Sequence, residues 1–207
     1  MGYFSEKKKQ SIIAGLLDAK NDEAMLEKLR ILQNEISVAY DTKVLAITSL
    51  DEDDIACAFA SALADAYERN GKRCLLVDAN LYNPCLLKVL GLENEDGFRG
   101  HDNENLKIYP RGDKGGILFM KQETYPSIIY KNKTIQKCIE NNKDAYDHFV
   151  VLTPNIKDHK EIALLRDAIS SVLLVTRRSA TKKGDIFNAL QFLVANEIPV
   201  SKTIILK

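Results

Sequence analysis

The residues with the clearest chemical meaning form a short run at positions 49–54, which reads Ser-Leu-Asp-Glu-Asp-Asp. The run follows the apolar stretch 44–47 and precedes an Ala- and Leu-rich stretch, 55–69, so it joins a predicted buried strand to a predicted helix. In nucleotide-binding α/β proteins such a turn holds phosphate with glycines, one lysine and a Ser or Thr hydroxyl. Here the turn has no glycine and no lysine, and its four consecutive carboxylates are Asp51, Glu52, Asp53 and Asp54. The sequence therefore predicts a phosphate-binding fold whose phosphate site is replaced by negative charge.

Three roles are open to these four carboxylates. The favoured one is structural: Asp51 is placed as a helix N-cap, and the following acids lie in the first turn, where the helix dipole favours negative charge. A second role is a divalent cation site built from the same acids with Asp78, although consecutive acids rarely converge on one ion. A third is nucleotide binding in an altered pose, because Asp78, Thr153 and Arg177 remain at predicted strand ends.

The elements that position these residues alternate along the chain. Short, nearly continuous apolar runs predict strands at 44–47, 74–77, 106–109, 147–152, 172–176 and 203–206. Helical spacing or composition predicts helices at 22–37, 55–69, 86–90, 134–143, 161–170 and 184–196. This alternation indicates an α/β fold with a doubly wound, mainly parallel sheet covered by helices on both faces. Ligands of such sheets bind at the carboxyl ends of the strands, where Asp78, Thr153 and Arg177 are expected.

Size and charge narrow the classes of protein. The 207 residues suffice for one domain with a full core, so we expect N-terminal helices in 1–40 packed on a single domain of 41–207. Lys plus Arg and Asp plus Glu both number 29, which gives no overall field to attract nucleic acid. No apolar run approaches the ~20 residues of a membrane span. Four cysteines without a C-x-x-C pair are typical of a reduced, cytoplasmic protein.

Several motifs, in the right order, carry a resemblance to a known family. They are Glu27-x-x-Arg30-x-x-Gln33, the stretch 70–84 (NGKRCLLVDANLYNP) and the stretch 146–154 (YDHFVVLTP), which ends in Thr153-Pro154. The chain resembles the bacterial tyrosine kinases of the capsular exopolysaccharide family, which share a deviant-Walker P-loop fold with MinD and ParA. The resemblance implies a P-loop-NTPase-like sheet, an oligomer contact through Glu27, Arg30 and Gln33, and a nucleotide site at Asp78, Asn80, Thr153, Pro154 and Arg177.

The departures from the family pattern fall on its functional positions. Gly-Lys-Ser/Thr is missing from the phosphate loop, Asn80 stands where the second segment carries its second acid, and Leu152 stands where the third segment carries its acid. Losing the loop lysine removes a charge-assisted contact of about 1.5–3 kcal/mol. The matches preserve the structural residues around each motif, so the pattern favours an intact fold without its chemistry.

The sequence therefore favours a catalytically inactive homologue that acts as a scaffold or regulator of capsule or exopolysaccharide assembly. Its expected partner is a protein, either a kinase-like subunit or a membrane polysaccharide co-polymerase, and it is expected to form homo-oligomers. The expected place is the cytoplasm, at the inner face of the membrane when held by that partner. No metal site and no cofactor are expected; ATP and Mg²⁺ enter only under a first alternative, an atypical tyrosine kinase or ATPase. A second alternative is a binding module for another ligand at the strand ends.

Overall fold

The computed structural model describes residues 14–16, 18, 22–40, 43–50, 53–91, 106–120, 126–178 and 180–206. The spacing of Ile12, Ile13 and Leu17 predicts one of the N-terminal helices expected in 1–40, and these three residues lie outside the described ones. Leu16, which is described, is buried in the same core as the sheet. No helix in the described ranges is both long and apolar enough to cross a lipid bilayer.

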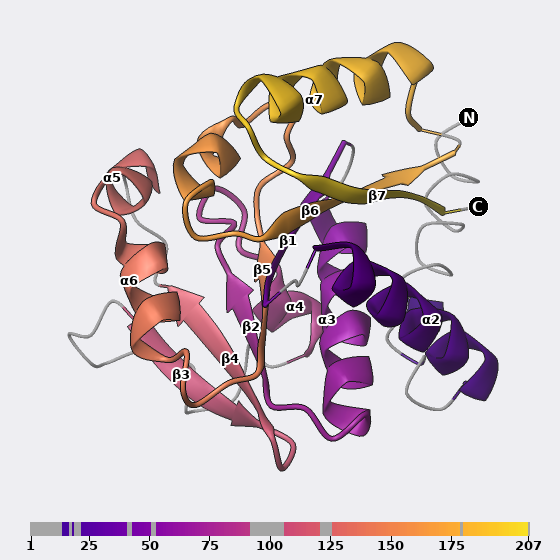
Figure 1. Ribbon diagram of the computed structural model, residues 1–207, viewed down its shortest axis with the longest axis vertical. Helices are drawn as coiled ribbons and strands as arrows, with labels where there is room; N and C mark the ends of the chain where they lie inside the picture. Colours follow the sequence, from indigo (N-terminus) through magenta and orange to yellow (C-terminus); the bar gives the residue numbers. More distant parts are fainter. Residues whose placement is uncertain are drawn as a thin grey trace.

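One seven-stranded sheet forms the centre of the described chain, with the strand order β3-β4-β2-β5-β1-β6-β7 (Figure 1). Its strands are β1 (Val44–Ser49), β2 (Cys74–Asp78), β3 (Leu106–Arg111), β4 (Gly115–Met120), β5 (His148–Leu152), β6 (Ser171–Arg177) and β7 (Val200–Leu206). All neighbouring strands are parallel except β3 and β4, which pair antiparallel at one edge. β1, β2, β5 and β6 are buried along nearly their whole length, as their continuous apolar runs predicted.

Helices cover both faces of this sheet (Figure 1). On one face lie α2 (Glu23–Tyr40), α3 (Asp53–Arg69) and α4 (Leu86–Val89). On the other lie α5 (Pro126–Lys131), α6 (Thr134–Asn141), the 3₁₀ helix η2 (Glu161–Leu165) and α7 (Lys183–Ala195). The predicted doubly wound, mainly parallel α/β fold is thereby confirmed. The helix predicted over 161–170 is wrong in type and length, because only five residues form a 3₁₀ helix before turns lead into β6.

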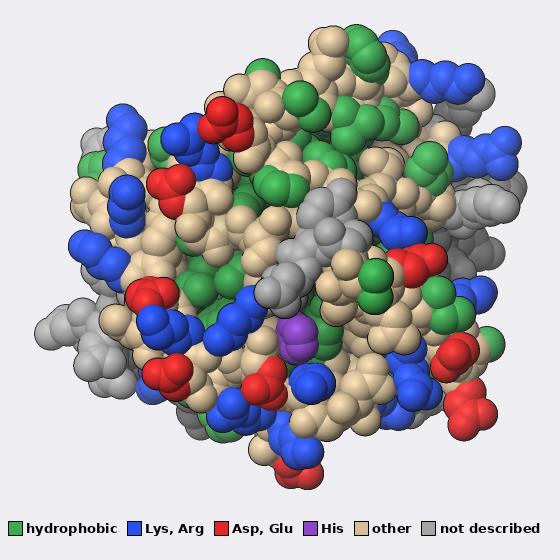
Figure 2. All heavy atoms as spheres, viewed as in Figure 1, with side chains coloured by type: hydrophobic (Ala, Val, Ile, Leu, Met, Phe, Trp, Pro, Cys, Tyr) green, Lys and Arg blue, Asp and Glu red, His purple; other side chains and the backbone are tan. Residues whose placement is uncertain are grey.

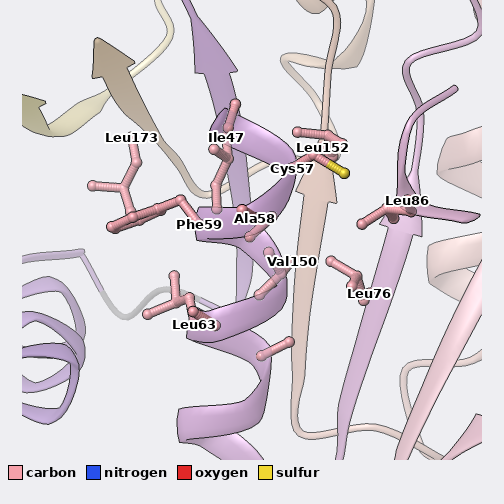
Figure 3. Packing of buried hydrophobic residues seen from close by; sticks show 14 of the residues in the cluster. Ile47, Cys57, Ala58, Phe59, Leu63, Leu76, Leu86, Val150, Leu152 and Leu173 are labelled. Carbon is pink, nitrogen blue, oxygen red and sulfur yellow. The ribbon is translucent and has the colours of Figure 1, made fainter. Parts of the chain in front are cut away.

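The packing of α3 on the sheet explains the composition of 55–69. Alanine recurs at alternate positions from Ala56 to Ala66, and each of these side chains is almost fully buried. Small side chains let the axis of α3 lie close to the strands. Larger side chains of the same helix fill the space on either side of the alanines. In Figure 3, Phe59 of α3 points toward Leu173 of β6, and Leu63 lies one turn further along the same helix. Cys57 and Cys74 are buried here without a disulfide, which fits their predicted role as small core residues.

An ionic cluster fastens the β3–β4 hairpin to α3. The Arg111 guanidinium lies 2.6 Å from Glu68 Oε1 and 2.5 Å from Asp65 Oδ1, and it also donates to the carbonyl of Ser61 at 3.0 Å. The Arg111 side chain is only 11% exposed, so these partners replace most of its water. Burial raises the pKa of Glu68 above its usual value, and the nearby Arg111 opposes that shift. The hairpin therefore depends on contacts between residues more than 40 positions apart.

Candidate functional site

The carboxyl ends of β1, β2, β5 and β6 meet at one edge of the sheet, as expected for parallel neighbours. This edge brings together Ser49 at the end of β1, Asp78 at the end of β2 and Arg177 at the end of β6. Asp78 is the register partner of Leu152 on β5, which is in turn the partner of Ile47 on β1. The residues predicted at the strand ends are therefore neighbours in space, although up to 128 positions separate them in sequence.

Asp53 occupies the first turn of α3, at the head of the helix that follows β1. Its carboxylate accepts a hydrogen bond from Ser49 Oγ at 3.3 Å and from Asn83 Nδ2 at 3.5 Å. The Cys85 thiol lies 3.9 Å from the Asp53 carbonyl. A carboxylate in the first turn interacts favourably with the positive end of the helix dipole. Asp53 thus places negative charge in the first turn of α3, the end of a helix where anionic ligands bind in other proteins.

The other three carboxylates of the acidic run are those of Asp51, Glu52 and Asp54. Asp51 and Glu52 lie outside the described residues, so the predicted N-cap role of Asp51 stays a prediction. Asp54 follows Asp53 in the first turn of α3 and is half-buried.

Asp78 is enclosed at the end of β2, with only 2% of its surface exposed. Its carboxylate accepts hydrogen bonds from the backbone N–H of Asn80 at 3.1 Å and of Leu86 at 3.2 Å. Burial raises the pKa of Asp78 from the usual 3.8 to about 7; hydrogen bonds from the backbone of Leu86, Asn80 and Cys85 oppose this shift, and the charge of Asp53 adds to it. The side chain in this geometry ties the loop 79–86 to the strand end.

Asn80 takes the place of an acid that the family pattern carries at this position. It is fully buried, and its Oδ1 accepts a hydrogen bond from the backbone N–H of Asn83 at 3.2 Å. Its Nδ2 is buried without a hydrogen-bond partner within the described part of the chain. A buried amide N–H left unbonded costs about 1–3 kcal/mol, which makes Asn80 an energetically unusual residue of this edge.

The turn after β5 is bonded to β1 and offers little to a ligand. The backbone N–H and the hydroxyl of Thr153 both donate to the carbonyl of Ile47, at 2.9 and 3.2 Å. The hydroxyl of Thr48 donates to the carbonyl of Pro154 at 2.8 Å. Leu152, where the family pattern has an acid, is fully buried in the core beneath the edge. These bonds engage the N–H and hydroxyl of Thr153 and the carbonyl of Pro154 within the protein.

Arg177 closes the edge at the end of β6. It is 5% exposed, and its carbonyl accepts hydrogen bonds from the backbone N–H groups of Ala180 and Thr181, both at 3.2 Å. The Arg177 side chain is thus buried at the end of β6, while the next residue, Arg178, is exposed.

The described part of this edge can be compared with the sites that hold magnesium and a triphosphate in P-loop proteins. Such a ligand needs a lysine and backbone N–H groups on the phosphates and carboxylates that can reach the ion. The described edge instead offers the carboxylate of Asp53 at the helix N-terminus, an enclosed Asp78 and the apolar Leu152. Within the ranges that the structure describes, no group of three or more His, Cys, Asp or Glu side chains is placed to hold a metal ion.

A polar cluster beside this edge was not found from the sequence. Tyr82 donates its hydroxyl to Glu161, and the His159 ring stacks on the Tyr82 ring at 3.9 Å between centroids. Burial and the bond to Glu161 raise the pKa of Tyr82 to about 12. Tyr130 donates its hydroxyl to the carbonyl of Ala79. The Tyr82–Glu161 pair spans 79 positions, and no local pattern announces such a contact.

The motif on α2 divides between surface and core. Glu27 and Arg30 are exposed and form an ion pair at 3.5 Å. Gln33, predicted with them as an interface residue, is buried. Its side-chain amide joins α2 to α3 and to the residue after it: Nε2 donates to the carbonyl of Leu63 at 3.2 Å, and Oε1 accepts from Asn70 Nδ2 at 2.8 Å. Gln33 therefore fixes α2 on α3 rather than presenting its amide at the surface.

Comparison with known proteins gives the following relatives. No family model matches the chain. The EpsB protein of Ralstonia nicotianae, named as a tyrosine-protein kinase, is 24% identical over 181 residues, which cover 83% of this chain and 24% of EpsB. The tyrosine-protein kinase CpsD of Streptococcus agalactiae serotype III is 24% identical over 159 residues, covering 70% of this chain and 65% of CpsD. The chain thus spans about a quarter of the length of EpsB and about two thirds of that of CpsD.

Solved structures share the fold. The kinase domain of the Escherichia coli tyrosine kinase ETK has a TM-score of 0.77 at 18% identity, over 92% of this chain and 78% of that one. The VpsO kinase domain gives 0.72 at 16% identity, over 99% and 98%. MinD in the MinC:MinD complex of Aquifex aeolicus gives 0.58 at 22% identity, over 79% and 68%. The predicted resemblance to bacterial tyrosine kinases of the capsular exopolysaccharide family is confirmed, and the fold is that of the P-loop NTPases.

Proposed function

We propose that this chain is a catalytically inactive homologue of the polysaccharide-biosynthesis tyrosine kinases and that it serves as a scaffold or regulator in capsule or exopolysaccharide assembly. The observation that carries the proposal is the carboxylate of Asp53 at the head of α3, held by Ser49 and Asn83. In a working phosphate site that space belongs to the ligand's own negative charge. A triphosphate placed there would meet like charge within a few ångströms, which disfavours binding.

The remaining site residues support the same proposal. The sequence offers no loop lysine to offset the phosphate charge. Leu152 is buried and apolar at the position where relatives of this fold carry a metal-organising acid. Asp78 accepts hydrogen bonds from backbone N–H groups of this chain, and the Thr153 hydroxyl donates to a backbone carbonyl. Burial of Leu152 and the hydrogen bonds of Asp78 and Thr153 stabilise the fold, and none of them requires a nucleotide.

Calorimetric titration with ATP and ADP, with and without Mg²⁺, tests the loss of nucleotide binding. We expect no heat of binding in any of the four titrations, with CpsD titrated in parallel as the positive control. Micromolar binding that depends on Mg²⁺ and disappears in Asp78→Ala would overturn the proposal.

An atypical kinase or ATPase is the competing function, and the titration behaviour of Asp78 favours it. With a pKa of about 7, this carboxyl exchanges protons near neutral pH, which suits a general acid or base. Phosphotransfer to a tyrosine peptide or release of phosphate from ATP, abolished in Asp78→Asn, would establish this function.

A third candidate is a binding module for another ligand at the strand ends, and the buried amide of Asn80 supports it. A small molecule accepting from Asn80 Nδ2 in a soaked crystal would support it.

The proposed scaffold role needs a partner surface, and we place it on the exposed part of α2. Glu27 and Arg30 are a solvent-facing ion pair beside a groove of about 470 Å³ between α2 and α3. The proposed partner is a kinase-like subunit or a membrane polysaccharide co-polymerase, which would bring the chain to the inner face of the membrane. Co-purification should be lost in Arg30→Glu and kept in Lys137→Glu, which reverses an exposed charge on α6. Equal capture by both variants would refute this surface.

A further inference from the structure

Two of the four cysteines meet beside the head of α3. The Cys85 thiol lies 3.9 Å from the carbonyl oxygen of Asp53. In an α-helix this carbonyl accepts from the N–H four residues further on, which here belongs to Cys57. A helical side chain also leans toward the preceding turn, so the Cys57 sulfur lies over the turn that contains Asp53. The two sulfurs therefore lie beside the same helical turn, although 28 positions separate Cys57 from Cys85 in the sequence.

The direction of the Cys57 side chain agrees with this placement. In Figure 3 its sulfur points away from Phe59 and toward the side of α3 on which Leu86 lies. Leu86 follows Cys85 in the chain, and both pack in the same core cluster as Cys57. The thiols of Cys57 and Cys85 are also hydrogen-bonded to each other. The two sulfurs are thus in contact, which is the first geometric requirement for a disulfide.

The other two cysteines lie elsewhere in the fold. Cys74 begins β2 and Asp78 ends it, so Cys74 lies about 13 Å from the strand end that Cys85 follows, at about 3.3 Å per residue. Cys138 belongs to α6 on the opposite face of the sheet, where Asn142 Nδ2 lies 3.8 Å from its sulfur. All four cysteines belong to the described residues, and the fold brings one pair of them into contact.

Both members of this pair are held in place. Cys57 lies within α3 and is fully buried. Cys85 is 2% exposed and is fixed through its backbone, because its N–H donates to the Asp78 carboxylate and its carbonyl accepts from the N–H of Val89 at 2.9 Å. Two groups that are already held in contact lose little further freedom when they react. Once one of the thiols has been activated, closure onto the other should therefore be fast.

We propose that Cys57 and Cys85 form a redox-sensitive pair, which closes into a disulfide that ties the loop 79–86 to α3. The oxidant is a low-molecular-weight disulfide. The Cys85 thiolate attacks one sulfur of this oxidant, so that a mixed disulfide forms and the first small thiolate leaves. The Cys57 thiolate then attacks the Cys85 sulfur, and the second small thiolate leaves. Two protein thiols are thereby oxidised by two electrons, the oxidant is reduced to two thiols, and the two protons pass to the leaving groups.

The cysteine of the loop reacts first. The hydrogen bond with Cys57 lowers the pKa of Cys85, but burial and the charge of Asp78 outweigh it and leave the pKa raised. Burial raises the pKa of Cys57 well above its usual value, and the bond to Cys85 adds to the rise. Cys85 is therefore the better source of thiolate. It also lies between Pro84 and the four-residue helix α4, whereas Cys57 lies in a 17-residue helix, so local opening exposes Cys85 first.

The disulfide would fix the loop that encloses Asp78. This loop carries Asn80 and Tyr82, and the backbone N–H of Leu86 at its end donates to the Asp78 carboxylate at 3.2 Å. In the thiol form, hydrogen bonds and packing hold the loop and allow it to open. In the disulfide form, a covalent bond to α3 opposes that opening. The redox state thus sets how readily this edge of the sheet opens, whether or not the edge binds a nucleotide.

Peptide mapping after oxidation tests the pair directly. The reagent is hydroxyethyl disulfide, which is small and uncharged; Figure 2 shows cations and anions interspersed over one face of the molecule, so surface charge should not direct it. The folded wild-type chain should lose two hydrogens and yield one linked pair of peptides, with Cys57 joined to Cys85 and with Cys74 and Cys138 still thiols. A folded chain without this link, a link to another cysteine, or a link that forms only in urea would overturn the proposal.

Single substitutions test the order of the two steps. Cys57→Ala should stop at the mixed disulfide on Cys85, because the second thiol is missing. Cys85→Ala should leave Cys57 as a thiol under the same conditions. Cys138→Ala, on the other face of the sheet, is the matched control and should form the disulfide as the wild type does. A mixed disulfide on Cys57 in Cys85→Ala would refute the order of attack, and circular dichroism confirms that each variant is folded.

Thermal unfolding measures the effect of the disulfide on the chain. The oxidised wild type should have a Tm about 5–10 °C above that of the reduced form, because a cross-link of this span restricts the unfolded chain. Dithiothreitol should reverse the rise, and Cys57→Ala treated with the same reagent should not show it. A Tm that falls on oxidation would mean that the two sulfurs are badly placed for the bond, and it would overturn the proposal.

Discussion

The stability of this chain should decrease as pH rises from about 4 to about 7, and Asp78 should cause much of the decrease. Its folded pKa is about 7 and its usual value is 3.8, so the folded state holds a proton across this window that the unfolded state releases. The difference of about three pKa units corresponds to about 4 kcal/mol at 1.36 kcal/mol per unit. The pKa of about 7 already includes the opposing backbone hydrogen bonds, and local relaxation on ionisation reduces the expected effect to about 2–4 kcal/mol.

Asp78→Asn removes the titration while keeping the size of the side chain. At low pH the variant should be less stable by about 1–2 kcal/mol, because one amide group cannot accept from both Asn80 and Leu86. As pH rises the wild-type chain loses stability and the variant does not, so the difference between them should shrink and then reverse. The sign follows from the raised folded pKa, since full stability is present below the unfolded value and is lost through the folded one.

Urea unfolding followed by circular dichroism at several pH values between about 4 and about 8 measures this difference. Glu68→Gln is the matched control, because burial also raises the pKa of Glu68 and its own contribution must be separated. Asp147 acts elsewhere: hydrogen bonds from Arg73 lower its pKa to about 2, so its contribution is lost only under more acidic conditions. Parallel stability curves for wild type and Asp78→Asn would show that Asp78 ionises normally and that the argument from burial is wrong.

Three further predictions concern packing, and urea unfolding measures each. Gln33→Leu should cost about 1–3 kcal/mol, because the Leu63 carbonyl and the Asn70 side-chain amide lose their partner; an unchanged midpoint would contradict the bridge. Arg111→Met should cost about 3–5 kcal/mol by leaving two acids of α3 without their cation, and a neutral result would mean that solvent already reaches them. Gly116→Ala should cost about 1–3 kcal/mol, since a Cβ there would lie 2.4 Å from Tyr146 Oη, and Tyr146→Phe should restore part of the loss.

Local patterns sufficed for most of the architecture. Continuous apolar runs predicted the buried strands because a strand covered on both faces has no polar side to interrupt the run. The apolar run 117–120, for which no element was predicted, forms β4 through pairing with β2 on one side and β3 on the other. The helix predicted over 161–170 is wrong because Ile162 and Leu165 are buried from a five-residue 3₁₀ helix, η2, and turns follow it. The spacing of apolar residues indicates which side chains are buried. It does not determine whether an α-helix or a 3₁₀ helix buries them.

The sequence by itself determined most of the alternation of strands and helices, the resemblance to the tyrosine kinases, and the absence of a phosphate-loop lysine, because each depends on consecutive residues. Only the tertiary structure decided that Gln33 turns into the core, that Asp53 bonds Ser49 and Asn83, and that Cys57 and Cys85 meet beside the head of α3. Those facts depend on which distant segments the sheet places side by side. The order of the strands within the sheet depends on covering both of its faces at once. No single stretch of sequence contains that information.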